Sequence, residues 1–429
     1  MPPKIPVPGD YEISLERGFL PQLLPLKRLP DRYYSPWEEI MKNLPGLISQ
    51  KNLRYQVERL PLLSTFKLRS REEWQRAYVC LTFIANGYIW GGDRPIQTVP
   101  SSIAIPLFDV CKQLNTPPIA TYTSLCLWNY GLSRPDQDTY LPDNLVSINT
   151  FTGAQDEEWF YLISVAIERR AAPTIPLMLR AISHAYTENI EGLTICLSEF
   201  TSHIEDLCQL LERMYERCDP NIFYNNIRRF FLGSKAMEQF GLNGKLYYDC
   251  RTAKRVRSFH GASNAQSPLI QFFDVVLGID HSPMEPAKGL HGGYLQQSRL
   301  YMSGPHRRFI EDVAKIAVIK DYVQALPNIY DLQDAYCRCR NALRVLRDKH
   351  LQMAHRYIVV PSKQAISTES VISSLRGSGD TDFLPFLKQI RDETVLYQIP
   401  ASDRSHDPVV QSSATFVADW IVQMPIETH

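Results

Sequence analysis

His350 is the residue of this sequence whose type and surroundings most directly suggest chemistry. It lies in residues 331–359, where one helix face would collect Leu332, Tyr336, Cys339, Leu343, Leu346, His350, Met353 and Tyr357. A neutral imidazole on a buried helix face can ligate haem iron through one ring nitrogen, while the other nitrogen needs a hydrogen-bond partner. His355, five residues further on, would point about 140° away, and we expect it to face solvent.

Spacing alone leaves two interpretations of His350 open, and it favours a hydrogen-bonded core histidine over an iron ligand. The other histidines have no metal-ligand spacing, and H-E-x-x-H, Walker A, G-x-S-x-G and G-x-G-x-x-G motifs are absent from the sequence. Cys337 and Cys339 form a C-x-C without the second pair of a zinc site. The nine scattered cysteines are expected to be reduced core residues.

Arg228 is a second candidate for chemistry. A helix through this part of the chain would place Phe223, Ile227 and Phe230 on one face, with Arg228 beside them. A guanidinium group next to an aromatic helix face can hold a carboxylate through two hydrogen bonds. The alternative is a surface arginine whose aliphatic stem covers apolar area, and spacing alone favours it.

The elements that must position these residues are mostly helical. In residues 1–150, short helices are expected at 35–49 and 71–86 among dense proline and glycine turn signals. From residue 151 onward, the expected helices are 156–172, 177–186, 189–217, 219–233, 268–278 and 331–359. Asp156 and Asp219 are expected to cap two of them, and Gly233 and Gly278 to end two of them in the left-handed conformation.

We therefore predict an all-α, mainly helical protein without convincing strands. A small N-terminal domain, 1–150, would lie over a large helical domain, 151–429. Residues 362–381 are rich in Gly, Ser and Thr and are expected to form a mobile loop, and the polar residues 398–429 a poorly ordered tail.

Composition limits the partners of the chain. Lys plus Arg and Asp plus Glu are 46 each, so the zero net charge gives no global attraction to nucleic acid or to an anionic membrane. The N-terminal residues contain prolines and charges where a signal peptide has a continuous apolar core, and the apolar runs are too short for a bilayer span. We expect a cytoplasmic monomer that binds neither nucleic acid nor membrane.

Several separated motifs, found in the same order, resemble the indoleamine 2,3-dioxygenase family, with the fungal members most similar. These are GFLP, PWEEIMKNLPGLI, ANGYIWGG, VPSSIAIPLFDVCKQLNTPPIATY, FHGASNAQSPLIQFFDVVLGID, GPHRRFI, LRDKHLQMAHRYIVVPS and GSGDTDF. The resemblance runs from about residue 15 to 395. It implies a small N-terminal domain over a large all-helical domain that holds b-type haem.

The resemblance assigns His350, in the LRDKHLQ motif, as the proximal ligand of the haem iron, and so reverses the preference that spacing gave. Asp274 and Arg347 match family positions associated with haem retention. A carboxylate–guanidinium pair could stabilise the helix that carries His350 without contacting the iron.

The resemblance also assigns the substrate pocket. Phe160 and Ser164 match the helix above the haem, while Phe223 and Arg228 match residues that enclose the indole ring and hold the substrate carboxylate. No acid or base is implied, and Ser164 is not expected to act as one. The other matching positions are Tyr122, Leu125 and Cys126 on the inner wall, Ala262 and Ser263 over the haem edge, and Ser378 in the loop that closes on the substrate.

Two positions depart from the family pattern. Asn264 stands where a smaller residue is expected, and Ile270 replaces an aromatic residue of the vertebrate enzymes. Both bear on the range of substrates rather than on the reaction.

The implied function is oxidative cleavage of the indole C2–C3 bond of L-tryptophan with O2, giving N-formylkynurenine in tryptophan catabolism by the kynurenine pathway. An electron donor would keep the iron ferrous. Three alternatives stay open. One is a haem enzyme that acts on a modified indole, which Asn264 motivates, and another is a haem- or tryptophan-binding regulator without efficient turnover. The third is an all-helical scaffold without a cofactor, which would show no Soret band.

Overall fold

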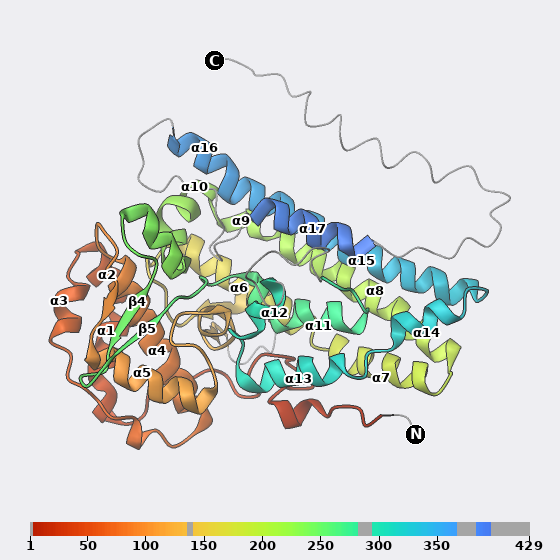
Figure 1. Ribbon diagram of the computed structural model, residues 1–429, viewed down its shortest axis with the longest axis horizontal. Helices are drawn as coiled ribbons and strands as arrows, with labels where there is room; N and C mark the ends of the chain where they lie inside the picture. The colour runs from red at the N-terminus through yellow and green to blue at the C-terminus, as the bar shows by residue number, and fades with distance from the viewer. Residues whose placement is uncertain (1–2, 135–139, 282–293, 367–382, 396–429) are drawn as a thin grey trace, which may run out of the picture.

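The computed structural model describes residues 3–134, 140–281, 294–366 and 383–395 of the chain (Figure 1). As expected, the described part is mainly helical, with a few short strands. Figure 1 shows the N-terminal helices gathered at one end and the long helices of the later sequence running through the rest. One hydrophobic core contains residues from both regions.

In the described residues of the N-terminal region, five α-helices are joined mainly by 3-10 turns and loops. The main one, Arg71–Trp90, begins where the Ser70 hydroxyl accepts a hydrogen bond from Glu73 N and is longer than its expected range of 71–86. Within it, buried Arg76 forms an ion pair of 2.7 Å with buried Glu38. The α-helices are α1 Ser35–Lys42, α2 Leu44–Ser49, α3 Leu53–Glu58, α4 Arg71–Trp90 and α5 Ser101–Leu114, and the 3-10 turns are η1 Pro8–Tyr11, η2 Arg32–Tyr34, η3 Thr65–Lys67 and η5 Pro142–Asn144.

The described residues include five short strands, which the sequence did not reveal as convincing strands. The strands are β1 Thr98–Val99, β2 Tyr130–Leu132, β3 Leu145–Ser147, β4 Leu246–Asp249 and β5 Lys254–Arg257. β2 and β3 form an antiparallel pair, and β4 pairs antiparallel with β5 and parallel with β1. Runs of two to four residues are too short to show a period-2 pattern, which explains why the sequence did not reveal them. Because β1 and β4 come from different regions, the sheet joins both sides of residue 150, and the division at this residue stays a prediction.

The later region is a helix assembly around two long helices, α8 and α15, which pack along one another. Its α-helices are α6 Gln155–Arg170, α7 Thr174–Tyr186, α8 Ile190–Glu212, α9 Met214–Arg217, α10 Pro220–Ile222, α11 Pro268–Val276, α12 Tyr294–Arg299, α13 Gly304–Ala314, α14 Ile319–Ala325, α15 Tyr330–Ala354, α16 Val360–Ile366 and α17 Phe383–Val395. Its 3-10 turns are η7 Arg228–Phe231, η8 Ser234–Phe240 and η9 Asn264–Gln266. Three π-helical segments are η4 Thr123–Leu127, η6 Phe223–Ile227 and η10 His355–Val359.

Several predicted helix ends are correct and others are not. Asp219 caps α10 by accepting from Asn221 N and Ile222 N, and Gly278 has a φ of +61°, both as expected. Asp156 is not a cap, because it lies inside the first turn of α6, and its carboxylate accepts from Asp219 N instead. Gly233 is extended, with a φ of −79°, so it does not end a helix in the left-handed conformation. A glycine is needed at this position for a different reason. A Cβ there would lie 2.5 Å from Gly261 N, so two backbone segments meet at this position.

The expected mobile loop, 362–381, begins too early, because residues 362–366 belong to α16. The rest of that loop, from residue 367, and the predicted tail, 398–429, lie outside the described residues. No helix in the described ranges is long and apolar enough to cross a membrane.

Candidate functional site

His350 lies in the last third of α15, on the face that the sequence predicted. The other seven members of the predicted stripe are buried, and His350 alone keeps part of its surface accessible. His355 is exposed, as expected from its angle around the helix. The stripe therefore packs into the core, with His350 as its one half-buried member.

The chemical state of His350 fits a haem ligand. Its surroundings lower the pKa of the imidazole to about 4, mainly through burial and additionally through the nearby charge of Arg347. The ring is therefore neutral at physiological pH, which is the form that binds iron. A packed core histidine would also be neutral, so the assignment of His350 as the ligand rests on the LRDKHLQ motif and stays a prediction.

Asp274 and Arg347, the pair associated with haem retention, are in contact. Asp274 on α11 and Arg347 on α15, both buried, form an ion pair through Asp274 Oδ1 and a guanidinium nitrogen. Arg347 also donates to Thr394 Oγ1 and, over 3.1 Å, to Ile390 O, both on α17. Burial alone would raise the pKa of Asp274, but Arg347 and His281 hold it below its ordinary value. The carboxylate thus stays ionised beside the helix that carries His350.

His281 completes this polar network and was not identified from the sequence. Its Nε2 lies 3.2 Å from Asp274 Oδ2, and its Nδ1 lies 2.6 Å from Glu393 Oε2 on α17. Burial opposes the charged imidazole, but the two carboxylates raise the pKa of His281 above its ordinary value. In the sequence, His281 lies seven residues after Asp274 and beyond the end of α11. Helical periodicity does not predict contacts outside a helix, so this position did not indicate the contact with Asp274.

Phe160 and Phe223, predicted to enclose the indole ring, lie together. Their ring centroids are 4.9 Å apart, and Phe231 stacks on Phe160 with a centroid distance of 5.5 Å. Phe223 also meets Tyr357 edge to face at 5.7 Å. Because Tyr357 lies two turns after His350 on the same stripe, this contact connects the helix of the ligand with the aromatic cluster on α6 and η6.

Arg228 follows directly after η6 and is not a surface residue. It is 2% exposed, and its guanidinium carbon lies 5.2 Å over the ring of Tyr224. Burial lowers the pKa of Arg228, against a smaller contribution from Tyr224, yet a guanidinium group remains protonated in proteins. The alternative of a solvated arginine that only covers apolar surface is therefore wrong.

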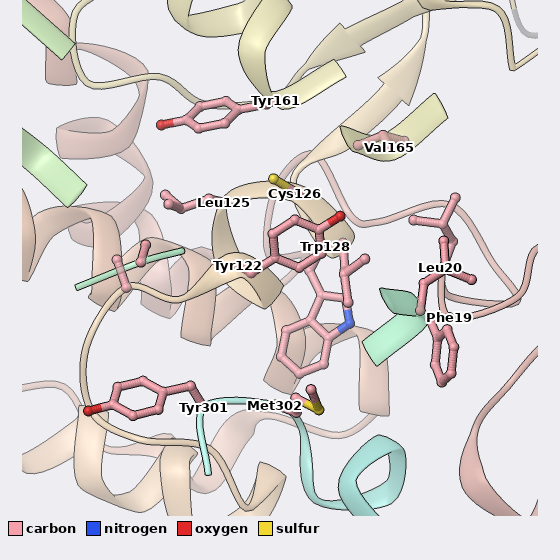
Figure 2. Packing of buried hydrophobic residues seen from close by; sticks show 14 of the residues in the cluster. Phe19, Leu20, Tyr122, Leu125, Cys126, Trp128, Tyr161, Val165, Tyr301 and Met302 are labelled. Carbon is pink, nitrogen blue, oxygen red and sulfur yellow. The ribbon is translucent and has the colours of Figure 1, made fainter. Parts of the chain in front are cut away.

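The predicted inner wall is formed by η4 and the residue before it. Tyr122, Leu125 and Cys126 are buried, and η4 packs against α6. Figure 2 shows the ring of Tyr122 beside Cys126 and Trp128, with its hydroxyl on the side of Val165 rather than of Leu125. Ser164, half-buried on α6, donates to Phe160 O over 3.4 Å. Burial raises the pKa of the Cys126 thiol well above its usual value.

The segment from Ala262 to Asn264 precedes α11. Ala262 is buried, whereas Ser263 and Asn264 are half-buried. Ser263 caps η9, since its hydroxyl accepts from Ala265 N over 3.2 Å. Ile270, the other departure, is half-buried on α11. Ser378 lies outside the described residues, so its predicted place over the substrate stays a prediction.

The fold and these contacts define a mainly helical protein with a neutral histidine on a central helix and a buried arginine beside an aromatic cluster. The family model of indoleamine 2,3-dioxygenase matches residues 7–396. An indoleamine 2,3-dioxygenase of Aspergillus candidus is 38% identical over 394 residues, which cover 90% of this chain and 96% of the relative. The chain belongs to the indoleamine 2,3-dioxygenase family, and it is accordingly a haem-dependent oxidoreductase.

Two further relatives differ in the substrate that their names give. An indoleamine 2,3-dioxygenase of Saccharomyces cerevisiae is 36% identical over 436 residues, covering 91% of this chain and 93% of the relative. A 6-hydroxytryptophan 2,3-dioxygenase of Fusarium equiseti is also 36% identical, over 404 residues, covering 91% of this chain and 98% of the relative. Membership of the family therefore establishes a dioxygenase of indoles and leaves the particular indole open.

Proposed function

We propose that this enzyme cleaves the C2–C3 bond of L-tryptophan with O2 and releases N-formylkynurenine. The observation that carries the proposal is the buried Arg228, one residue beyond a π-helical turn that begins at Phe223. A buried, permanently charged guanidinium group is suited to a carboxylate. The adjoining rings of Phe160 and Phe223 are suited to an indole. An amino acid with an indole side chain satisfies both.

Haem, bound through His350, would supply the activation of O2 that an unassisted protein side chain cannot provide. The side chains have the task of orientation. Arg228 holds the substrate carboxylate, the aromatic residues fix the plane of the indole, and the apolar wall of Leu125 and Cys126 excludes water. Ser164 is not assigned a proton-transfer role.

The central experiment is an optical titration of the purified, reduced protein with L-tryptophan, first without and then with O2. The Soret band and the formation of N-formylkynurenine are followed together. We expect a spectral change on binding and product formation only after O2 is admitted. Binding without product would refute the proposal.

Substitution of Arg228 tests the carboxylate contact. Loss of a charge-assisted, two-pronged hydrogen bond in a dry site costs on the order of 2–4 kcal/mol, so Arg228→Ala should lower kcat/KM by about 30- to 1000-fold. Arg228→Lys should rescue this only in part, because the planar fork is lost. The matched control is Arg229→Lys, since the neighbouring Arg229 donates to the backbone at Gly92 O. Wild-type turnover by Arg228→Ala at low tryptophan would exclude the assignment.

A modified indole is the second candidate substrate. The half-buried Asn264 adds a polar amide where a small residue is expected, and the relative from Fusarium equiseti is named for 6-hydroxytryptophan. An amide group can hydrogen-bond a ring hydroxyl. Comparison of kcat/KM for L-tryptophan, D-tryptophan and 6-hydroxytryptophan separates the two, and Asn264→Ala should selectively weaken use of the hydroxylated ring if this candidate is correct.

We further propose a cytoplasmic monomer that depends on an external electron donor to keep the iron ferrous. The balanced charge supports the lack of attraction to nucleic acid. Cell fractionation and light scattering of the haem-loaded protein test the compartment and the monomer. Omission of ascorbate and a redox mediator should abolish turnover.

A further inference from the structure

Glu168 is a buried carboxyl group that the proposed reaction does not use. It lies one turn beyond Ser164 on α6 and is 1% exposed. Its Oε1 accepts two hydrogen bonds, from the Tyr122 hydroxyl over 3.0 Å and from the Ser267 hydroxyl over 2.7 Å. Within the described ranges its Oε2 has no hydrogen-bond partner, and no Lys, Arg or His is recorded in an ion pair with it.

The two donors come from the two segments that flank the predicted pocket. Tyr122 immediately precedes η4, which carries the inner wall, and Ser267 immediately precedes α11 and follows the segment from Ala262 to Asn264. A second link runs between the same segments, because Tyr122 N donates to Gln266 Oε1 over 3.0 Å. Among the described residues, Glu168 is hydrogen-bonded to both segments and so connects them to α6, the helix that also carries Phe160 and Ser164.

We propose that Glu168 is a positioning residue for the substrate: its carboxyl group holds Tyr122 and the segment before α11 in fixed places relative to α6. The inference rests on the proposed function, since it takes these segments as walls of the indole pocket. In this role Glu168 acts through Tyr122 and Ser267 and not by contact with the indole. Substrate affinity should therefore depend on a residue outside the contact surface.

The protonation state of Glu168 gives this role a measurable signature. Burial raises the pKa of its carboxyl group to about 7, although the hydroxyl groups of Ser267 and Tyr122 oppose the increase. The titratable groups that face it are Tyr122 and Cys126, and burial raises the pKa of both well above their usual values, so neither gains charge between pH 6 and 8.5. Over this range Glu168 changes from a neutral group to a buried anion that has two hydrogen-bond donors but no cationic partner. Because a buried charge is costly, ionisation destabilises the closely packed arrangement of the pocket.

Two substitutions separate the hydrogen bonds from the charge. Glu168→Gln keeps an oxygen that can accept from both hydroxyl groups and cannot ionise. Glu168→Leu has a similar size and removes the acceptor. The readouts are the Kd of L-tryptophan by equilibrium dialysis, KM and kcat at pH 6 and 8.5, and the Soret band as the control for haem content.

We expect Glu168→Leu to raise Kd and KM by about tenfold, the effect of losing buried hydrogen bonds, with kcat changed less than about threefold and an unaltered Soret band. Wild-type Kd should rise at least about threefold from pH 6 to 8.5, whereas Kd of Glu168→Gln should be nearly constant. Should Glu168→Leu not fold, Tyr122→Phe and Ser267→Ala each remove one donor and are expected to raise Kd in the same direction.

A wild-type Kd in Glu168→Leu, or in both single-donor variants, would overturn the inference, as would an unchanged pH dependence in Glu168→Gln. Failure of the proposed function looks different, because the wild-type enzyme would then form no product from L-tryptophan. In that case the same variants are compared with 6-hydroxytryptophan as the ligand, and the same outcomes decide the role of Glu168.

Discussion

The burial of Glu168 has a consequence for stability that can be measured independently of substrate. Its folded-state pKa of about 7 lies above the ordinary value of 4.5. The folded protein therefore keeps a proton that the unfolded chain releases as the pH rises from 4.5 to 7. The wild-type protein should lose stability relative to Glu168→Gln over this interval, and the loss should be complete above about pH 7.

The magnitude follows from the difference between the two pKa values. A pKa difference of one unit corresponds to about 1.4 kcal/mol, so the full effect is about 3 kcal/mol. Between pH 5 and 9, where part of the titration has already occurred, the free energy of unfolding of wild type should fall by about 2–3 kcal/mol relative to Glu168→Gln. The Gln variant carries its own cost at every pH, because its amide nitrogen occupies the site of the unpartnered Oε2.

The assay is urea unfolding of both haem-loaded proteins at pH steps from 5 to 9, compared as a difference at each pH so that other titrating groups cancel. Glu157→Gln is the matched control, since Glu157 is a buried carboxylate on the same helix. It accepts from Phe151 N, Thr152 N, the Thr152 hydroxyl and the Tyr161 hydroxyl. An amide nitrogen on either side would face a donor, so this variant should be destabilised throughout. A constant difference between wild type and Glu168→Gln across the range would refute the reasoning.

His350→Ala should lose the Soret band and the activity together, whereas His355→Ala, at an exposed position, should keep both; haem content per chain and turnover check this. Arg347→Met removes one of the two cationic partners of the buried Asp274 carboxylate, leaving His281, and should cost about 3 kcal/mol in urea unfolding, with faster loss of haem. Asp219→Ala removes the cap of α10 and should cost about 1 kcal/mol, while Asp219→Asn should cost less; thermal unfolding compares the two.

The helical framework could be predicted because amphipathic spacing records which face of a long helix is buried. The stripe on α15 extends over seven turns, so its orientation and the difference between His350 and His355 followed from sequence alone. The identity of His350 as a ligand did not, since spacing cannot distinguish a ligand from a packed histidine. That step required the surrounding motif, and the lowered pKa of the imidazole leaves it in the neutral form that binds iron.

The polar contacts of the site could not be predicted, because they join residues far apart in the chain. Glu168 meets Ser267 across 99 positions, and Arg347 meets Asp274 across 73. A carboxylate inside an amphipathic helix has no periodic signature that distinguishes a buried acceptor from a solvated charge. Sequence reasoning found no carboxylate at the pocket for this reason, although Glu168 lies only one turn from the predicted Ser164.

The π-helical segments bear on the site independently of family resemblance. In an α-helix, residues five apart point about 140° away from one another. In η6 the Arg228 N–H bonds back to Phe223 O, five residues earlier, and this wider turn brings such residues close to stacking. Phe223 and Arg228 therefore lie on the same side of the chain, whereas in a regular α-helix they would point about 140° apart.

The same hydrogen bond between residues five apart recurs in the other two π-helical segments. The Trp128 N–H donates to Thr123 O at the inner wall, and the Val360 N–H donates to His355 O beyond His350. Because η6 packs on α6 and η10, and η4 packs on α6, these irregular turns gather around the same aromatic cluster. The backbone thus departs from the regular helix at the place where the proposed function requires an aromatic ring and a guanidinium group on the same side.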